Sequence, residues 1–190
     1  LEWLEPVFLI RTLGLVGVIA IVFAESGFLF CFFLPGESLL FTAGLIASQG
    51  HLPIGWLLVG CFVAAVAGDS VGYAFGKKIG PKIFSRDDSF FFKKSHVERT
   101  KNFYAKHGRK TIILARFVPI VRTFAPVLAG VGAMPYREFL RFNIVGALLW
   151  SVGVTSLGYL LGSAVPQAER YILPIVILII VVSFIPILTH

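Results

Sequence analysis

Residues 116–130 read Arg-Phe-Val-Pro-Ile-Val-Arg-Thr-Phe-Ala-Pro-Val-Leu-Ala-Gly, and this stretch decides how the rest of the chain is interpreted. It places two guanidinium groups and two prolines inside a segment that is otherwise apolar enough to enter a bilayer. A charged side chain at the bilayer centre costs about 2.5–3.5 kcal/mol on insertion scales, so such residues usually have a function. Pro119 and Pro126 should break the helix, and broken backbone at membrane depth is tolerated only inside protein or beside a wet cavity. The stretch therefore predicts a site for an anionic head group within the membrane.

The composition is that of an integral membrane protein. Of the 190 residues, 57% are hydrophobic and 14% are charged, and the mean hydropathy is +0.87, far outside the range of soluble proteins. No region has the pattern of a cleavable signal peptide, because Glu2 and Glu5 stand where a basic segment would be expected. Cys31 and Cys61 lie in apolar runs without metal-ligand spacing, so we expect both to be free and packed. We expect one membrane domain over residues 1–190.

The net charge of +7 is concentrated in residues 77–110, which carry eleven Lys or Arg against three acidic residues. By the positive-inside rule this basic loop is cytoplasmic. Residues 87–107 within it have the signals of an amphipathic helix that lies on the membrane surface. Basic clusters beside a membrane ordinarily set topology and attract anionic lipid. We therefore expect membrane lipids as partners of this loop and no nucleic acid.

Segment lengths favour two re-entrant hairpins. After a pattern typical of an interfacial helix in residues 1–12, the chain is apolar over residues 13–48, which is too long for one span and short for two. Pro35 and Gly36 mark a turn in this run, and Glu37 suits the start of the second arm. Residues 111–134 are similarly awkward in length and broken by the two prolines. Plain spans are expected over residues 54–75, 139–162 and, at the C-terminal end, within 167–190.

An internal repeat supports these hairpins. Residues 33–35 and 43–44 resemble residues 117–119 and 129–130, and residues 72–76 resemble 158–162, always at an offset of 84 to 86. Repeat 1 covers residues 13–76 and repeat 2 covers 111–162. Each unit is one hairpin plus one span, an odd number of crossings, so the second copy is inverted. The predicted fold is an all-α integral membrane protein with two oppositely oriented re-entrant hairpins and about three transmembrane helices in an inverted repeat, plus the interfacial cytoplasmic helix. Such repeats with paired broken segments point to a transport site at the membrane midplane.

The facing hairpins should bring Glu25 and Glu37 toward Arg116 and Arg122. The rigid donor fork of arginine suits a phosphate, which makes the two arginines candidate ligands of a lipid phosphate. Burial raises the proton affinity of a carboxylate and a neighbouring arginine lowers it, so the two glutamates are candidates for proton coupling. Asp69 is either an accessory site residue or a hydrated carboxylate near the membrane surface. Alternatively, the two glutamates and the two arginines form buried ion pairs with a structural role only. Such pairs add little stability compared with apolar side chains in the same place.

Two further patterns concern packing. Gly68, Gly72 and Gly76 recur at every fourth residue, which predicts close contact between helices. Arg141 and Asn143 are expected at the cytoplasmic mouth of the span over residues 139–162.

Taken together, the motifs resemble the DedA family of bacterial inner-membrane proteins, which is related to eukaryotic lipid scramblases with a VTT domain. The matching stretches are Glu25-Ser26-Gly27, residues 33–40, Gly68-Asp69-Ser70-Val71-Gly72-Tyr73, residues 116–122, Pro126, Ala129-Gly130 and Met134. The resemblance covers nearly the whole chain. It implies a pair of opposed re-entrant hairpins in the bacterial inner membrane.

The resemblance also implies a function, the transport of a phosphate-bearing lipid. Family members are linked to undecaprenyl phosphate and to phosphatidylethanolamine. The functional acids of the family match Glu25 and Glu37, and its functional arginines match Arg116 and Arg122. Proton coupling remains an inference from the residues.

Two other classes of function stay open. One is an intramembrane enzyme acting on lipid phosphates, although the chain has no catalytic His pair, no HExxH and no run of aspartates for a metal. The other is a proton-coupled cation antiporter or a non-transporting assembly factor. We expect no enzyme activity, no metal and no cofactor. The sequence leaves the oligomeric state open, and a homodimer is compatible with it.

Overall fold

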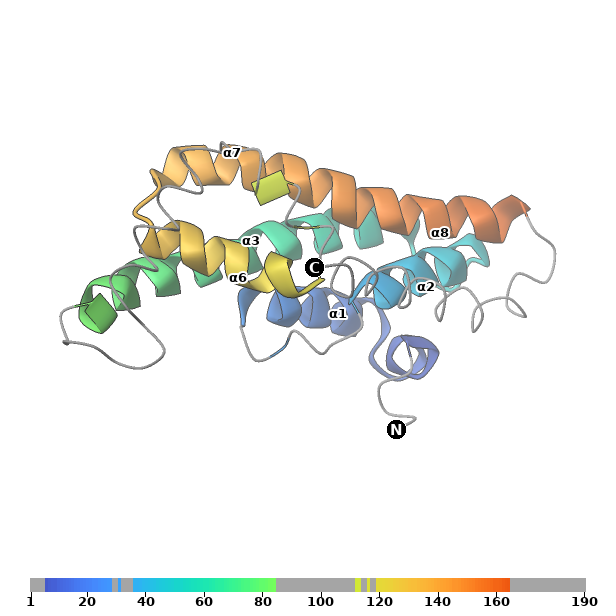
Figure 1. The fold of residues 1–190 in the computed structure, drawn as a ribbon. Coiled ribbons are helices and arrows are strands. Elements are labelled where there is room, and N and C mark those ends of the chain that lie inside the picture. The colour runs from blue at the N-terminus through green and yellow to red at the C-terminus, as the bar shows by residue number, and fades with distance from the viewer. Residues whose placement is uncertain are drawn as a thin grey trace, which may run out of the picture.

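The computed structural model describes residues 6–28, 31, 36–84, 112, 113, 116 and 119–164, and this part of the chain is helical without strands (Figure 1). The helices, in chain order, are α1 (Pro6–Gly27), α2 (Gly36–Ser48), α3 (Ile54–Phe84), α6 (Pro119–Val131), α7 (Tyr136–Ala147), the π-helical η3 (Leu148–Val152) and α8 (Gly153–Ala164). Because α7, η3 and α8 follow one another without a gap, they form one long rod (Figure 1). The all-α fold class predicted from the sequence is confirmed for the described residues.

Within the described part of the chain, two helices are long and apolar enough to cross a membrane, Ile54–Ile79 within α3 and the rod Tyr136–Ala164. They correspond to the spans predicted over residues 54–75 and 139–162. Helix α3 does not end near Gly76 but continues to Phe84. Lys77 and Lys78 prolong it because lysine is a good helix former whose ammonium group can reach water from a membrane surface.

Three other apolar helices are too short to cross a membrane: Leu13–Gly27, Gly36–Ser48 and Val121–Val131. At about 1.5 Å per residue, a helix such as α2 is about 20 Å long, whereas the hydrocarbon core is about 30 Å thick. These lengths suit the arms of re-entrant hairpins, and the hairpins and their inversion stay predictions. The turn at Pro35, the surface helix over 87–107 and the span within 167–190 lie outside the described residues.

Helix α1 contains a break that the sequence analysis did not predict. Gly14 has φ 61° and ψ −157°, so two helical segments meet there at a kink. A positive φ of this kind is readily adopted only by glycine. In Figure 1 the segment before Gly14 is seen nearly end-on, close to the N-terminus, and runs in a different direction from the rest of α1. Its separate direction fits the interfacial helix expected for residues 1–12, of which residues 1–5 are outside the described part.

Helix α2 packs closely along α8 (Figure 1). A Cβ atom on Gly44 would lie 2.1 Å from the backbone oxygen of Thr155, and one on Gly158 would lie 2.1 Å from that of Phe41. Since real Cβ atoms never come this close to backbone, both glycines are needed for this packing. Small residues allow helices to approach in this way in lipid, where van der Waals contact drives association.

Helix α6 packs on α3 in the same manner. A Cβ atom on Gly130 would lie 2.1 Å from the backbone oxygen of Tyr73, and one on Gly76 would lie 2.1 Å from that of Val127. A Cβ atom on Gly68 would come within 2.7 Å of the backbone of α1. The close packing predicted from the glycine series on α3 is therefore confirmed, and it involves two different neighbouring helices.

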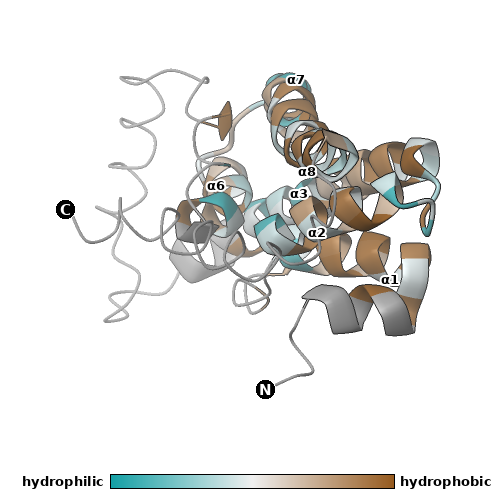
Figure 2. Cartoon of the chain, turned by 90° about the vertical axis from the view of Figure 1, so that its right-hand side faces the viewer, coloured by the Kyte–Doolittle hydropathy of each residue, from teal (hydrophilic) through white to brown (hydrophobic). Residues whose placement is uncertain are grey.

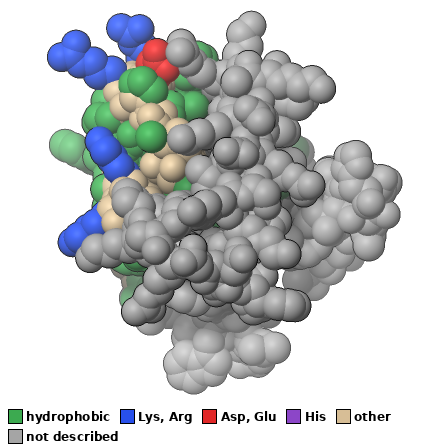
Figure 3. Space-filling model, turned by 60° about the vertical axis from the view of Figure 1, so that its left-hand side comes forward, with side chains coloured by type: hydrophobic (Ala, Val, Ile, Leu, Met, Phe, Trp, Pro, Cys, Tyr) green, Lys and Arg blue, Asp and Glu red, His purple; other side chains and the backbone are tan. Residues whose placement is uncertain are grey.

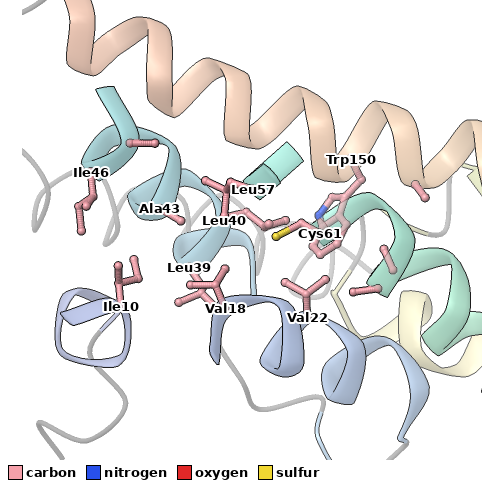
Figure 4. Close-up of a cluster of buried hydrophobic side chains, with 14 residues drawn as sticks. Ile10, Val18, Val22, Leu39, Leu40, Ala43, Ile46, Leu57, Cys61 and Trp150 are labelled. Atoms are coloured by element: carbon pink, nitrogen blue, oxygen red, sulfur yellow. The ribbon is translucent and has the colours of Figure 1, made fainter. Parts of the chain in front are cut away.

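The apolar core joins α1, α2, α3 and η3. Figure 4 shows its buried side chains, which include Val18, Val22, Leu39, Leu40, Leu57, Cys61 and Trp150. Cys61 is free and fully buried, as expected for a thiol that packs as a small apolar group. Large hydrophobic side chains are also exposed on the outside of the helices, among them Val16, Trp56, Leu149 and Leu160, and Figure 2 shows that hydrophobic residues are frequent along α1 and α8. Apolar side chains both inside and outside the packing are typical of helices that face lipid.

Candidate functional site

Arg122 joins the two predicted hairpins through Glu25. Nη2 of Arg122, on α6, donates a hydrogen bond to Oε1 of Glu25, near the end of α1. Glu25 is 1% exposed and Arg122 is 3% exposed. A fully buried pair of opposite charges is stabilised only when geometry and surrounding hydrogen bonds are favourable. The pairing predicted between an acidic residue of the first segment and an arginine of the second is therefore present.

Glu37 completes this first group of charges. Its Oε1 lies 3.8 Å from Nη1 of Arg122, and its side chain is 17% exposed. It stands in the first turn of α2, where a carboxylate is favoured by the helix dipole, as the sequence predicted. Glu37 is thus the member of the group with most access to the surroundings, whereas Glu25 is sealed inside.

Gly36 allows the Glu25 carboxylate to reach the start of α2. A Cβ atom at Gly36 would lie 1.6 Å from Oε2 of Glu25, so any other residue here would require the Glu25 carboxylate to move. The sequence analysis assigned Gly36 only to the turn. The structure adds a second reason for glycine, because the carboxylate of α1 occupies the space beside its Cα atom.

Arg116 forms a second group of charges with a different acidic residue. Its Nη2 donates hydrogen bonds to Oδ2 of Asp69 on α3 and to Oδ1 of Asn143 on α7. Nδ2 of Asn143 donates in turn to the backbone oxygen of Val66, at 3.1 Å. Arg116, Asp69 and Asn143 are 2%, 1% and 0% exposed. Asp69 is therefore the buried partner of Arg116 and not a hydrated carboxylate at the membrane surface.

Trp150 covers the guanidinium of Arg122. The Cζ atom of Arg122 lies 4.2 Å from the centroid of the indole ring. Trp150 belongs to the π-helical turn η3, which interrupts the rod of α7 and α8. Single π-helical turns often occur at functional sites, where they redirect a side chain. A cation over an indole face is stabilised by about 2 kcal/mol or more when both are desolvated.

The two arginines retain hydrogen-bond donors that no described residue uses. Nε and Nη1 of Arg116, and Nε and Nη1 of Arg122, have no hydrogen-bond partner among the described residues. The end of α1 packs on α3 at Gly68, next to Asp69, so the Glu25–Arg122 pair and the Asp69–Arg116 pair lie in neighbouring parts of the fold. Buried donors without acceptors are unfavourable unless another group satisfies them. The four nitrogen atoms without a described hydrogen-bond acceptor on these two cations are donors that an oxyanion with several oxygens could use.

The ion pairs involve all five charged residues predicted for the site and fall into two groups, Glu25 and Glu37 with Arg122, and Asp69 with Arg116. The described partners of Arg116 are Asp69 and Asn143. The sequence analysis did not assign Asn143 or Trp150 to the site. Asn143 was expected at the mouth of its span with Arg141, but Asn143 is buried and Arg141 is exposed. An amide inside an apolar run was the available signal for Asn143.

The two prolines differ in their effects, and only Pro126 departs from the prediction. Pro119 is the first residue of α6, a position where the missing amide proton is harmless. Pro126 was expected to break the segment, but α6 continues through it to Val131. A helix packed in a membrane tolerates proline where neighbouring groups satisfy the freed carbonyl. Pro35 lies outside the described residues.

Comparison with known proteins agrees with this description. The VTT domain matches residues 34–160 of the chain. Protein DedA of Escherichia coli K12 is 47% identical over 168 residues, which cover 87% of this chain and 76% of DedA. An uncharacterised membrane protein of Mycobacterium leprae is 46% identical over 184 residues, covering 97% of this chain and 82% of that protein. No solved structure matches the chain. The chain therefore belongs to the VTT-domain family of membrane proteins, the family of DedA.

Proposed function

We propose that this protein is a transporter that moves a phosphate-bearing lipid, such as undecaprenyl phosphate or phosphatidylethanolamine, across the bacterial inner membrane with coupling to protons. The observation that carries the proposal is the pair of arginines, each at most 3% exposed, that are held by carboxylates of three other helices and keep unused N–H donors. A phosphate oxygen is a strong acceptor for such donors. In the proposal Arg116 and Arg122 bind the lipid phosphate.

Proton coupling follows from competition for Arg122. Glu25 and Glu37 both lie beside this guanidinium, so a lipid phosphate must share or replace their negative charge. Protonation of a glutamate removes one negative charge and leaves the arginine available to an anionic ligand. Glu37, which is partly exposed, is positioned to exchange protons with the surroundings, and Glu25 to hold one inside. Proton binding and phosphate binding then favour each other.

The helix packing supports an inverted repeat. Gly44 and Gly130 are equivalent at an offset of 86 residues, and so are Gly72 and Gly158. Gly44 packs against α8, the span of repeat 2, whereas Gly130 packs against α3, the span of repeat 1. Each short helix thus packs on the span of the other repeat. Two exchanged, equivalent contacts suit a protein whose halves rock against each other around a fixed site.

The proposal includes a topology and partners. The basic loop of residues 77–110 lies on the cytoplasmic side, where its lysines and arginines meet anionic lipid. The partners are lipid head groups, protons and membrane lipids, and a homodimer is compatible with the proposal. The chemistry requires no cofactor and no covalent change in the lipid, so the protein is not an enzyme.

Reconstitution into sealed vesicles tests the proposal. A phosphatidylethanolamine labelled on one tail should cross the bilayer faster with the wild-type protein, and Arg122→Ala should abolish this gain. Arg137→Ala is a matched control, because Arg137 is an exposed arginine of α7 that does not contact the site. Mass spectrometry of the lipid afterwards separates transport from catalysis, and a cation-sensitive dye separates it from antiport. A changed lipid, or cation flux without lipid movement, would refute the proposal.

A further inference from the structure

A groove lies beside the second half of α3, about two helical turns from Arg116, and we call it the polar groove after its lysine and hydroxyl side chains. Its lining residues come from α3 and from the first residue of α7: Ser70, Tyr73, Ala74, Lys77, Lys78 and Tyr136. The groove has a volume of about 530 Å³ and is open to the surroundings. Figure 3 shows Lys and Arg side chains along this side of the described surface.

The polar groups of this groove suit a phosphate. Lys77 and Lys78 are exposed, and neither makes an ion pair with another described residue. The hydroxyl of Tyr136 lies 3.2 Å from Oγ of Ser70, whose own proton is donated to the backbone oxygen of Val66 at 2.8 Å. Because the Ser70 hydroxyl donates to Val66, it accepts the proton of the Tyr136 hydroxyl, so both hydroxyl protons are engaged within the groove wall. The ammonium groups of Lys77 and Lys78 are therefore the donors that this groove offers to an anion.

The floor of the groove is rigid. Tyr73 is buried, and its hydroxyl donates to the backbone oxygen of Met134. Its ring stacks on Phe139 with the centroids 4.7 Å apart. The hydroxyl of Tyr73 is thus occupied, and the ring presents an apolar base beneath the polar rim. A groove with an aromatic base and a charged rim resembles the membrane interface, where both kinds of side chain gather.

The same face of α3 carries a second, apolar groove along its first half. This groove has a volume of about 600 Å³, and α3 contributes Trp56, Val59, Gly60, Val63, Ala64 and Ala67 to it. These positions and those of the polar groove follow one another at steps of one, three or four residues, which is the pattern of a single helix face. One face of α3 is therefore apolar first and then, from Ser70 onward, lined by cationic and hydroxyl groups. This is the order of a lipid tail and its head group.

We propose that the polar groove binds the phosphate of a membrane lipid and serves as a loading site next to the arginines. The role of the groove as a loading site rests on the proposed function, whereas the binding of a lipid phosphate in the groove does not. Lys77 is eight residues from Asp69, or about 12 Å along the helix axis. A phosphate in the groove is thus about two helical turns from the guanidinium of Arg116. The apolar continuation on α3 favours a lipid phosphate over a free phosphate ion, which would gain nothing from it.

Lipid association measured with a spin-labelled lipid tests this site. The purified full chain is placed in phosphatidylcholine vesicles with a small fraction of labelled phosphatidic acid or, in parallel, labelled phosphatidylcholine. The wild-type protein should select phosphatidic acid, and Lys77→Gln with Lys78→Gln should lower that selectivity by about thirtyfold, from the attraction expected of two lysines near the membrane surface. Arg137→Gln with Arg141→Gln removes the same charge from exposed positions outside the groove and should change it little.

The outcomes distinguish binding in the groove from a general attraction between basic side chains and anionic lipid. Lys77→Arg with Lys78→Arg keeps both charges and should retain the selectivity, which excludes a folding defect as the cause of the loss. The site would be overturned if the α7 double variant lost as much lipid selectivity as the lysine double variant, or if the lysine double variant lost none. Excess inorganic phosphate should not displace the lipid, and displacement would overturn the assignment to lipid. If the protein selects phosphatidic acid through these lysines but transports no lipid, the proposed function is refuted and the lipid-binding site in the groove stands.

Discussion

Arg122 donates a hydrogen bond to Glu25, although the two residues are 97 positions apart in the sequence. The bond joins α6 to α1, and Trp150 covers the guanidinium from the side of η3. One arginine therefore holds three separate parts of the fold in contact. A ligand that binds Arg122 would therefore change the contacts among α1, α6 and η3.

Arg122→Lys tests the requirement for a guanidinium. Lysine keeps the positive charge but loses the planar fork and the stacking on Trp150, so phosphate recognition should weaken. We expect lipid transport in vesicles to fall by at least about tenfold, since one charge-assisted hydrogen bond is worth about 1.5–3 kcal/mol. Transport at the wild-type rate in this variant would show that Arg122 supplies charge alone.

Asn143→Ala should destabilise the protein and displace Arg116. The amide is fully buried, accepts from Arg116 and donates to Val66, so its loss removes two buried hydrogen bonds. The expected cost is about 1–3 kcal/mol of unfolding free energy, measured by thermal unfolding in detergent. Arg141→Ala, two residues away and exposed, is the control and should be neutral. Equal stability of both variants would contradict the assigned contacts.

Gly36→Ala should disturb the site without altering any charge. Its Cβ atom would stand 1.6 Å from Oε2 of Glu25, so the carboxylate must move away from the start of α2. We expect transport to fall and the midpoint of thermal unfolding to drop. The control is Gly55→Ala, where no atom lies within 4 Å of the added Cβ. A fully active Gly36→Ala protein would mean that Glu25 does not need its observed position.

Gly130→Ala and Gly153→Ala separate helix packing from helix propensity. At Gly130 the added Cβ would lie 2.1 Å from the backbone of α3, so the two helices must separate. At Gly153, which has helical dihedrals and open space, alanine should stabilise the helix by about 0.5–1 kcal/mol. Thermal unfolding should therefore shift in opposite directions. A shift in the same direction for both would refute the close packing of α6 on α3.

Glu25→Gln should flatten the dependence of lipid binding on pH. In the wild-type protein, protonation of Glu25 weakens its pairing with Arg122, so binding of a phosphate lipid should rise as the pH falls. A glutamine is neutral at every pH and should give binding that is high and nearly constant. The measurement is the binding of a labelled phosphate lipid to the purified protein over a range of pH. An unchanged pH profile would exclude Glu25 as the coupling residue.

The sequence predicted the charges of the site better than their pairing. Charges inside apolar runs are expensive, so Glu25 and the two arginines could be recognised without coordinates. Which acid meets which arginine depends on how α3 and α7 pack, and spacing alone could not show that Asp69 belongs to Arg116. Trp150 was not predictable, because its place over Arg122 depends on a π-helical turn that has no clear sequence signal.

The backbone features also divide into those that the sequence predicted and those that it did not. The glycine series on α3 predicted close packing, since small residues at every fourth position form one face. The kink at Gly14 was missed because a single glycine in an apolar run is equally compatible with a straight helix. The break predicted at Pro126 was wrong, because proline usually ends a helix in water but is tolerated inside a packed membrane helix.

The most direct test of the phosphate site uses two lipids with the same labelled tail, phosphoethanolamine ceramide and glucosylceramide, in vesicles that contain the purified protein. We predict that the wild-type protein speeds the crossing of the phosphate lipid and not of the sugar lipid, and that Arg116→Ala with Arg122→Ala abolishes the difference. Equal crossing of both lipids, or undiminished crossing of the phosphate lipid in the double variant, would contradict recognition of a lipid phosphate by these two arginines.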